Sequence, residues 1–79
     1  MVVLKNVLSD MAKAIVDDPD RVEVIESRDQ NDNINLVLTV APEDMGMVIG
    51  RHGKIAKAIR TVIKAAATSL KVKVTVEIK

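Results

Sequence analysis

The sequence predicts an α+β fold, in the order α-β-β-α-α-β, with a three-stranded mixed sheet and helices packed on one of its faces. Apolar residues recur at helical spacing near the start and again between residues 54 and 69. In three other stretches they alternate with polar residues, as in half-buried strands. Because the chain has 79 residues, we expect one domain over residues 1–79.

The first helix is expected over residues 4–15. Pro19 follows it, and a proline disfavours helical backbone at the residue before it. Three aspartates between residues 17 and 20 sit poorly at the negative end of a helix dipole, so we expect an acidic loop there. The apolar stripe of this helix consists of Leu4, Val7, Leu8, Met11, Ala12 and Ile15.

A hairpin is expected next. Residues 21–27 alternate with Val22 and Val24 inward, and the polar cluster 29–33 predicts a turn. The second strand, over residues 34–40, shows clearer alternation. Its inward residues are Ile34, Leu36, Leu38 and Val40.

Two helices are expected before the last strand. Pro42 suits a first helical position and begins a short helix that reaches residue 49. A longer helix over 54–69 follows, and residues 72–78 alternate as a strand that can pair in parallel with the second strand through a crossover. For the longer helix we expect a buried face of Ile55, Ile59, Val62, Ile63 and Ala66 and a basic face of Lys57, Arg60 and Lys64, flanked by Lys54.

The composition excludes several kinds of site. The chain has no cysteine and one histidine, so it lacks the residues for a disulfide or a zinc cluster, and we expect no metal and no cofactor. No apolar run is long enough to span a membrane and no secretory signal is evident, so we expect a soluble cytoplasmic protein without a membrane partner. Without Phe, Trp or Tyr, nucleic acid cannot be bound by aromatic stacking.

Charge is divided unevenly along the chain. Residues 1–45 hold four basic and ten acidic residues, whereas residues 46–79 hold eight basic residues and one acidic residue. Such asymmetry is typical of a surface that faces a polyanion. Chance segregation of charge in a small protein would also explain it.

The segment Val48-Ile49-Gly50-Arg51-His52-Gly53-Lys54-Ile55 holds the candidate site. Two residues separate Gly50 from Gly53, whereas a P-loop needs four, and no Ser or Thr follows Lys54. Neither a dinucleotide fingerprint nor a nucleophilic triad fits, so we expect no enzyme activity.

A Gly-x-x-Gly turn that opens a helix suits a sugar-phosphate backbone. Glycine lets a ligand approach closely, and a helix start offers N–H groups to phosphate. Arg51 and Lys54 add positive charge, Lys57 extends it, and Ile49 and Ile55 offer an apolar groove for bases. A simple helix-to-helix turn with a C-cap glycine is the alternative for the two glycines. His52 could equally be an exposed polar residue or a residue that contacts a base.

The run Val48 to Gly53 resembles the Val-Ile-Gly-x-x-Gly signature of KH RNA-binding domains, and the element order resembles their type II form. With Ala58-Ile59-Arg60-Thr61 after the loop, the whole chain is similar to the small bacterial KH-domain RNA-binding protein family called KhpA. The resemblance implies that Gly50, Arg51, His52 and Gly53 contact phosphates, that Ile49 and Ile55 line the groove, and that residues 38–40 form its far wall.

The resemblance also implies partners and a role. Single-stranded RNA would be bound by a homodimer or by a heterodimer with a larger KH-containing protein. The protein would act as an RNA chaperone or post-transcriptional regulator linked to cell elongation and division. The alternative is a dimerising protein–protein adaptor with little affinity for RNA. One departure is Ala56, which stands where family members often carry a larger aliphatic residue.

Overall fold

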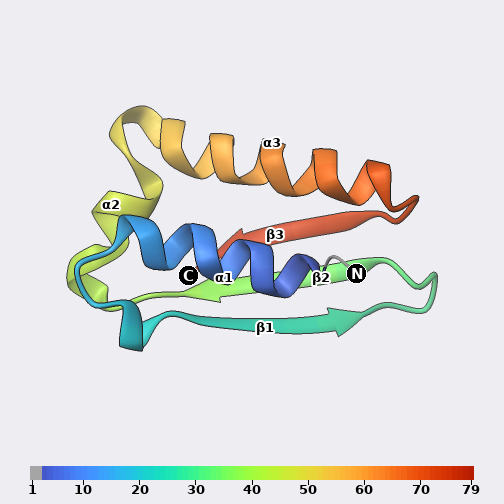
Figure 1. Ribbon diagram of the computed structural model, residues 1–79, viewed down its shortest axis with the longest axis horizontal. Coiled ribbons are helices and arrows are strands. Elements are labelled where there is room, and N and C mark those ends of the chain that lie inside the picture. Colours follow the sequence, from blue (N-terminus) through green and yellow to red (C-terminus); the bar gives the residue numbers. More distant parts are fainter. Residues whose placement is uncertain (1–2) are drawn as a thin grey trace.

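A three-stranded sheet and a layer of helices make up the fold (Figure 1). The computed structural model describes residues 3–79, so residues 1 and 2 of the predicted domain lie outside the described part. Short 3-10 turns precede β1, α2 and α3. The order confirms the predicted α-β-β-α-α-β arrangement. Its elements are α1 (Leu4–Ile15), β1 (Glu23–Arg28), β2 (Ile34–Thr39), α2 (Met45–Ile49), α3 (Lys54–Ser69) and β3 (Val74–Ile78).

The sheet is mixed, with strand order β1-β2-β3. β1 pairs antiparallel with β2, which places Val24 opposite Leu38. β2 pairs in parallel with β3, which places Leu36 opposite Val76. Both pairings agree with the predicted hairpin and crossover. β1 begins at Glu23, two residues later than predicted, so Val22 precedes the strand and packs half-buried against the core.

The core is aliphatic and lies between the helices and one face of the sheet. Leu8 of α1, Leu38 of β2 and Ile63 of α3 are fully buried. Burying each such side chain contributes about 1.5–3 kcal/mol. The predicted stripe of α1 is confirmed, because Leu4, Leu8 and Ala12 are buried and its other members pack against the core.

The predicted buried face of α3 is partly wrong. Ile55 and Val62 are 37% and 47% exposed, whereas Ala56 and Ala67 are buried beside Ile59 and Ile63. The apolar arc of α3 is wider than the surface that it covers. The small side chains of Ala56 and Ala67 let the backbone of α3 lie close to its neighbours, and Ile55 and Val62 remain on the exposed flank.

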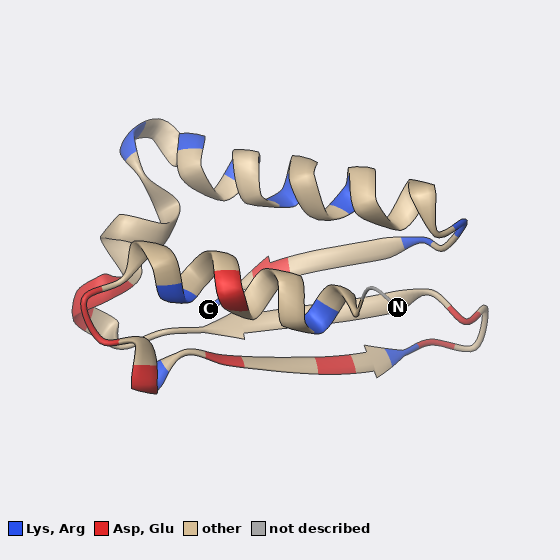
Figure 2. Cartoon of the chain, viewed as in Figure 1, with Lys and Arg blue, Asp and Glu red and all other residues tan. Residues whose placement is uncertain are grey.

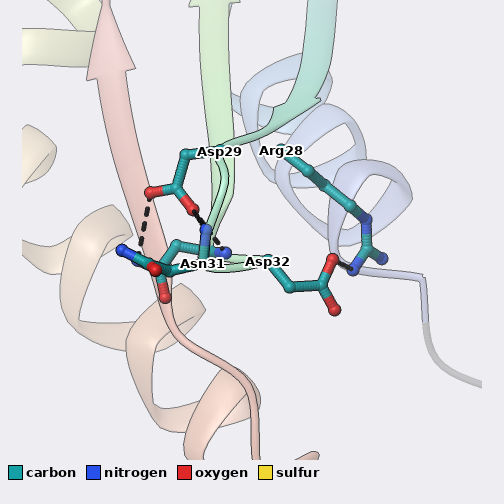
Figure 3. A network of polar contacts seen from close by, with 5 residues as sticks. Arg28, Asp29, Asn31 and Asp32 are labelled. Carbon is teal, nitrogen blue, oxygen red and sulfur yellow. Dashed lines mark hydrogen bonds and ion pairs between the residues drawn. The ribbon is translucent and has the colours of Figure 1, made fainter.

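The hairpin turn between β1 and β2 is held by its own side chains (Figure 3). The Asp29 carboxylate accepts hydrogen bonds from the Asn31 and Asn33 backbone N–H groups, at 2.8 and 3.0 Å, and from the Asn33 side-chain amide at 3.0 Å. The backbone N–H of Asn33, followed by its side chain, lowers the pKa of Asp29 from its ordinary value. Asp32 adopts a positive φ of 64° and pairs with Arg28 at 3.0 Å.

Candidate nucleic-acid interface

The loop of residues 50–53 connects two helices that are fixed in the core. Val48 of α2 and Ile59 of α3 are 0% and 2% exposed. In Figure 1 the loop lies at the end of the molecule opposite the hairpin turn. The loop is therefore displayed on a rigid support, because both of its flanking helices are anchored by buried residues.

The loop backbone depends on its two glycines for different reasons. Gly50 has φ 75° and ψ 175°, a conformation that is essentially restricted to glycine. A Cβ on Gly50 would lie 2.6 Å from Cγ1 of Ile55 and 2.9 Å from its backbone nitrogen. Gly53 is left-handed, with φ 73° and ψ 14°, and a Cβ there would meet nothing within 4 Å. His52 also has a positive φ of 58°.

The first turn of α3 has no side-chain cap. Gly53 stands at its N-cap, where Ser, Thr, Asp or Asn would usually accept from the N–H groups of that turn. The Gly53 N–H donates to the Gly50 carbonyl at 3.2 Å, and the Lys54 N–H donates to the Arg51 carbonyl. The positive end of a 16-residue helix therefore begins directly at the loop, without a carboxylate to neutralise it.

The predicted site residues lie together around this loop. Arg51, His52, Lys54 and Lys57 are exposed, and none of them forms an ion pair within residues 3–79. Ile49 and Ile55 are 39% and 37% exposed and give the loop an apolar flank. The Cβ geometry places Ile55 against Gly50, whereas Ala56 is buried in the core.

The predicted far wall at residues 38–40 is wrong. Leu38 and Val40 are 0% and 5% exposed and lie under the helices, because the inward side of β2 faces the core. The strand beside the basic flank of α3 is β3 instead. Nε of Arg60 donates to the Val76 carbonyl at 3.3 Å across this boundary. Sequence reasoning placed Arg60 on a basic face and gave no indication of this contact.

Charge is segregated in space as well as along the chain. In Figure 2 basic segments follow the loop and α3, whereas acidic segments gather where α1 leads to β1 and β2 leads to α2. Asp44, one of these acids, is 1% exposed and accepts a hydrogen bond from the Asp18 N–H at 3.1 Å. The basic flank of α3 is therefore open to a polyanion.

Two further findings concern residues 3–79. Among them there is no group of three or more His, Cys, Asp or Glu side chains that could hold a metal ion. No helix in this part of the chain has both the length and the apolar content to cross a membrane.

The element order and the mixed sheet define a type II KH fold, with its Gly-x-x-Gly loop between α2 and α3. The family described as KhpA/KhpB, KH domain, matches residues 5–78, and the chain belongs to this family.

Two curated relatives are each named RNA-binding protein KhpA. The relative from Clostridium acetobutylicum is 56% identical over 75 residues, which cover 95% of this chain and 99% of the relative. The relative from Caldanaerobacter subterraneus subsp. tengcongensis is 57% identical over 68 residues, 86% of this chain and 89% of the relative. These names describe RNA binding and no catalysis, in agreement with the expectation of a non-enzymatic protein.

Solved structures of Era share the fold. Aquifex aeolicus Era bound to GDP.AlF4- superposes with a TM-score of 0.63 at 16% identity, covering 95% of this chain and 29% of that chain. Era in complex with MgGDPNP and nucleotides 1506-1542 of 16S ribosomal RNA gives the same TM-score and identity, with 28% of that chain covered. This chain thus corresponds to less than a third of Era, and the likeness concerns the fold alone.

Proposed function

We propose that this protein is a non-catalytic binder of single-stranded RNA that holds the RNA backbone at the 50–53 loop. The observation that carries the proposal is the pair of positive-φ glycines directly before the uncapped start of α3. Membership of the KhpA/KhpB family, whose curated relatives are named RNA-binding proteins, supports it.

Phosphates are proposed to lie against the loop. Gly50 and Gly53 present no side chain there, so a phosphodiester can approach the backbone. The start of α3 offers N–H groups and a positive dipole end. The exposed side chains of Arg51 and Lys54, together with His52, contact the same phosphates, and Lys57 contacts the next one along the strand.

Bases are proposed to lie against the apolar flank of the loop. Ile49 and Ile55 are partly exposed and adjacent to Gly50, so a base that leaves a loop-bound phosphate can cover them. Aliphatic contact lacks the directional hydrogen bonds that distinguish bases. We therefore expect modest sequence specificity at these two positions.

A pair of variants at Gly53 that match in shape and differ in charge tests the proposal. Because a side chain at Gly53 meets open space and both Asp and Asn tolerate the left-handed conformation, Gly53→Asp and Gly53→Asn are expected to fold alike. Gly53→Asp places a carboxylate at the phosphate site and is expected to lower affinity for single-stranded RNA about tenfold or more at low salt. Fluorescence anisotropy with a labelled oligonucleotide measures this, and thermal melts check folding.

Salt dependence provides the second test. Contacts from Arg51, Lys54 and Lys57 predict that log K falls with log salt with a slope of about −2, at about −0.7 for each phosphate contact. Wild-type protein that fails to bind RNA at low salt contradicts the proposal. Equal RNA affinity of Gly53→Asp and Gly53→Asn would show that the RNA is not bound at the loop.

A second candidate function is protein pairing, which the exposed flank of α3 favours. Val62 is 47% exposed, and the small residues Ala58 and Ala65 are exposed on the same side, away from Lys57 and Arg60. We propose that a second copy, or a larger KH-containing protein, packs on this stripe. Val62→Glu is then expected to give a monomer in size-exclusion chromatography with light scattering, with Lys64→Glu as the control that leaves pairing unchanged.

The two candidate functions are separable. If the protein is mainly an adaptor, Gly53→Asp still pairs and the wild-type protein shows negligible RNA affinity. We also propose a cytoplasmic role as an RNA chaperone or post-transcriptional regulator linked to cell elongation and division, as the resemblance to the KhpA family implies. Crosslinking and sequencing of RNA bound to wild type and to Gly53→Asp tests whether cellular RNAs are held at the loop, and identical RNA sets from the two proteins would contradict binding there.

A further inference from the structure

Arg60 bridges α3 and the edge of the sheet. Its Nε donates a hydrogen bond to the backbone carbonyl of Val76 at 3.3 Å. β3 is an edge strand, because its single sheet partner is β2. The side chain of Arg60 therefore crosses from the basic flank of α3 to the strand edge that would otherwise be open. Among residues 3–79, by contrast, the side chains of Lys54, Lys57 and Lys64 form no hydrogen bond.

The contact between Arg60 and Val76 lies between the 50–53 loop and a cleft at the other end of α3. Beyond Arg60, in the direction away from the loop, a cleft of about 380 Å³ separates the last turns of α3 from the start of β3. Arg60 stands about 9 Å along the helix axis from Lys54, at a rise of about 1.5 Å per residue. An RNA strand that leaves the loop along this flank meets Arg60 before it reaches the cleft. The cleft is lined in part by Lys64, Thr68, Lys73 and Thr75.

The guanidinium of Arg60 keeps most of its donors. The bond to Val76 uses Nε, which leaves the N–H groups of Nη1 and Nη2 for a ligand. Glu77, the acid next to Val76 in sequence, pairs with Lys79 at 3.6 Å and not with Arg60. In a chain without Phe, Trp or Tyr, the guanidinium also offers a flat surface on which a base can stack.

We propose that Arg60 is a base-reading residue that selects guanine in the RNA strand leaving the loop. Two parallel N–H groups at one end of a guanidinium match the O6 and N7 acceptors of guanine, whereas adenine and uracil offer no pair of adjacent acceptors. The Val76 carbonyl holds the side chain in one orientation, so the fork is fixed before RNA arrives. This inference rests on the proposed RNA binding at the 50–53 loop.

Binding of short oligouridylates that carry one central guanosine, adenosine or cytidine tests the inference. Wild-type protein is expected to bind the guanosine oligonucleotide about tenfold or more tighter than the adenosine oligonucleotide. Arg60→Lys keeps the positive charge and loses the planar fork, so it is expected to weaken this preference with an unchanged salt slope. Lys64→Gln is the control, which removes one positive charge and is expected to keep the preference for guanosine.

Wild-type protein that binds RNA without preferring guanosine would overturn the assignment. So would Arg60→Gln that retains the preference, since its amide lacks the parallel N–H donors of the guanidinium fork. If neither the wild type nor any variant binds RNA, the proposed function itself fails. That outcome is distinct from RNA binding with no base preference. Arg60→Gln is an uncharged second variant and is expected to lose the preference for guanosine.

Discussion

The two turns at opposite ends of the molecule use their side chains in opposite ways. In the hairpin turn, Asp29 accepts three hydrogen bonds from Asn31 and Asn33, and Arg28 pairs with Asp32. In the 50–53 loop, neither Arg51 nor His52 forms a side-chain hydrogen bond or ion pair within the described residues. Both turns contain a non-glycine residue with positive φ, so backbone conformation alone does not separate them.

The difference shows what distinguishes a structural turn from a binding loop. A turn whose polar groups satisfy one another has little left to offer a ligand. A turn whose backbone is fixed by glycines and flanking helices can keep its charged side chains and its helix end for a partner. The 50–53 loop is of the second kind.

The largest expected effect separates the two glycines of the loop. Gly50→Ala places a Cβ against Ile55 in a conformation that only glycine adopts easily, and is expected to lower the free energy of unfolding by about 2–4 kcal/mol. Gly53→Ala meets no atom and bears only the left-handed backbone cost of about 1–2 kcal/mol. Urea unfolding of both variants measures the difference.

A third variant identifies the cause. Ile55→Ala removes the nearest clashing atom, Cγ1, so Gly50→Ala is expected to cost less in that background than in the wild type. The rescue is partial, because the backbone nitrogen of Ile55 remains 2.9 Å from the new Cβ. Equal costs for Gly50→Ala and Gly53→Ala would show that the contact with Ile55 is unimportant.

The hairpin turn is expected to affect stability and leave RNA binding unchanged. Asp29→Ala removes the acceptor of three exposed hydrogen bonds and is expected to lower the free energy of unfolding by less than Gly53→Ala does. RNA affinity is expected to equal that of the wild type, because the proposed RNA contacts are made by the 50–53 loop and Arg60 and not by this turn. Reduced RNA affinity in a folded Asp29→Ala protein would make the hairpin turn part of the interface.

The positive-φ residues of these two turns, His52 and Asp32, are expected to show a smaller difference in stability when each is replaced by glycine. His52→Gly relieves the left-handed strain at His52 and is expected to raise the free energy of unfolding by about 0.5 kcal/mol, after the extra entropy of glycine in the unfolded chain. Asp32→Gly is expected to gain less, since aspartate tolerates this conformation and the pair with Arg28 is lost. Thermal melts of both variants rank the two positions.

The smallest expected effect is a pH dependence that arises in the hairpin turn. The folded pKa of Asp29 is lowered, chiefly by the Asn33 backbone N–H. Its stabilisation is therefore complete above the ordinary carboxyl pKa of about 4 and is lost as the pH falls through the lower folded value. Unfolding curves at neutral and acid pH are expected to differ less for Asp29→Asn than for the wild type. An identical difference in both proteins would show that other carboxyl groups cause the acid sensitivity.

The sequence was sufficient to predict the elements and the position of the loop. The bounds of α1 and α3 match because periodicity, Pro19 and the glycines mark them locally. The exposure of Val62 could not be predicted, because which part of a wide apolar arc faces the sheet depends on packing. The hydrogen bond between Arg60 and Val76 joins elements that the sequence separates, so no local pattern indicates it.

The parallel pairing of β2 with β3 also has a consequence for how the protein is made. β3 docks beside β2 after α2 and α3 have been synthesised, and such distant contacts form late because closing the intervening segment costs entropy. A nascent chain that ends before β3 therefore has the loop and lacks the strand edge that holds Arg60. The complete surface that we propose to face RNA exists only once synthesis has passed β3, which ends at Ile78.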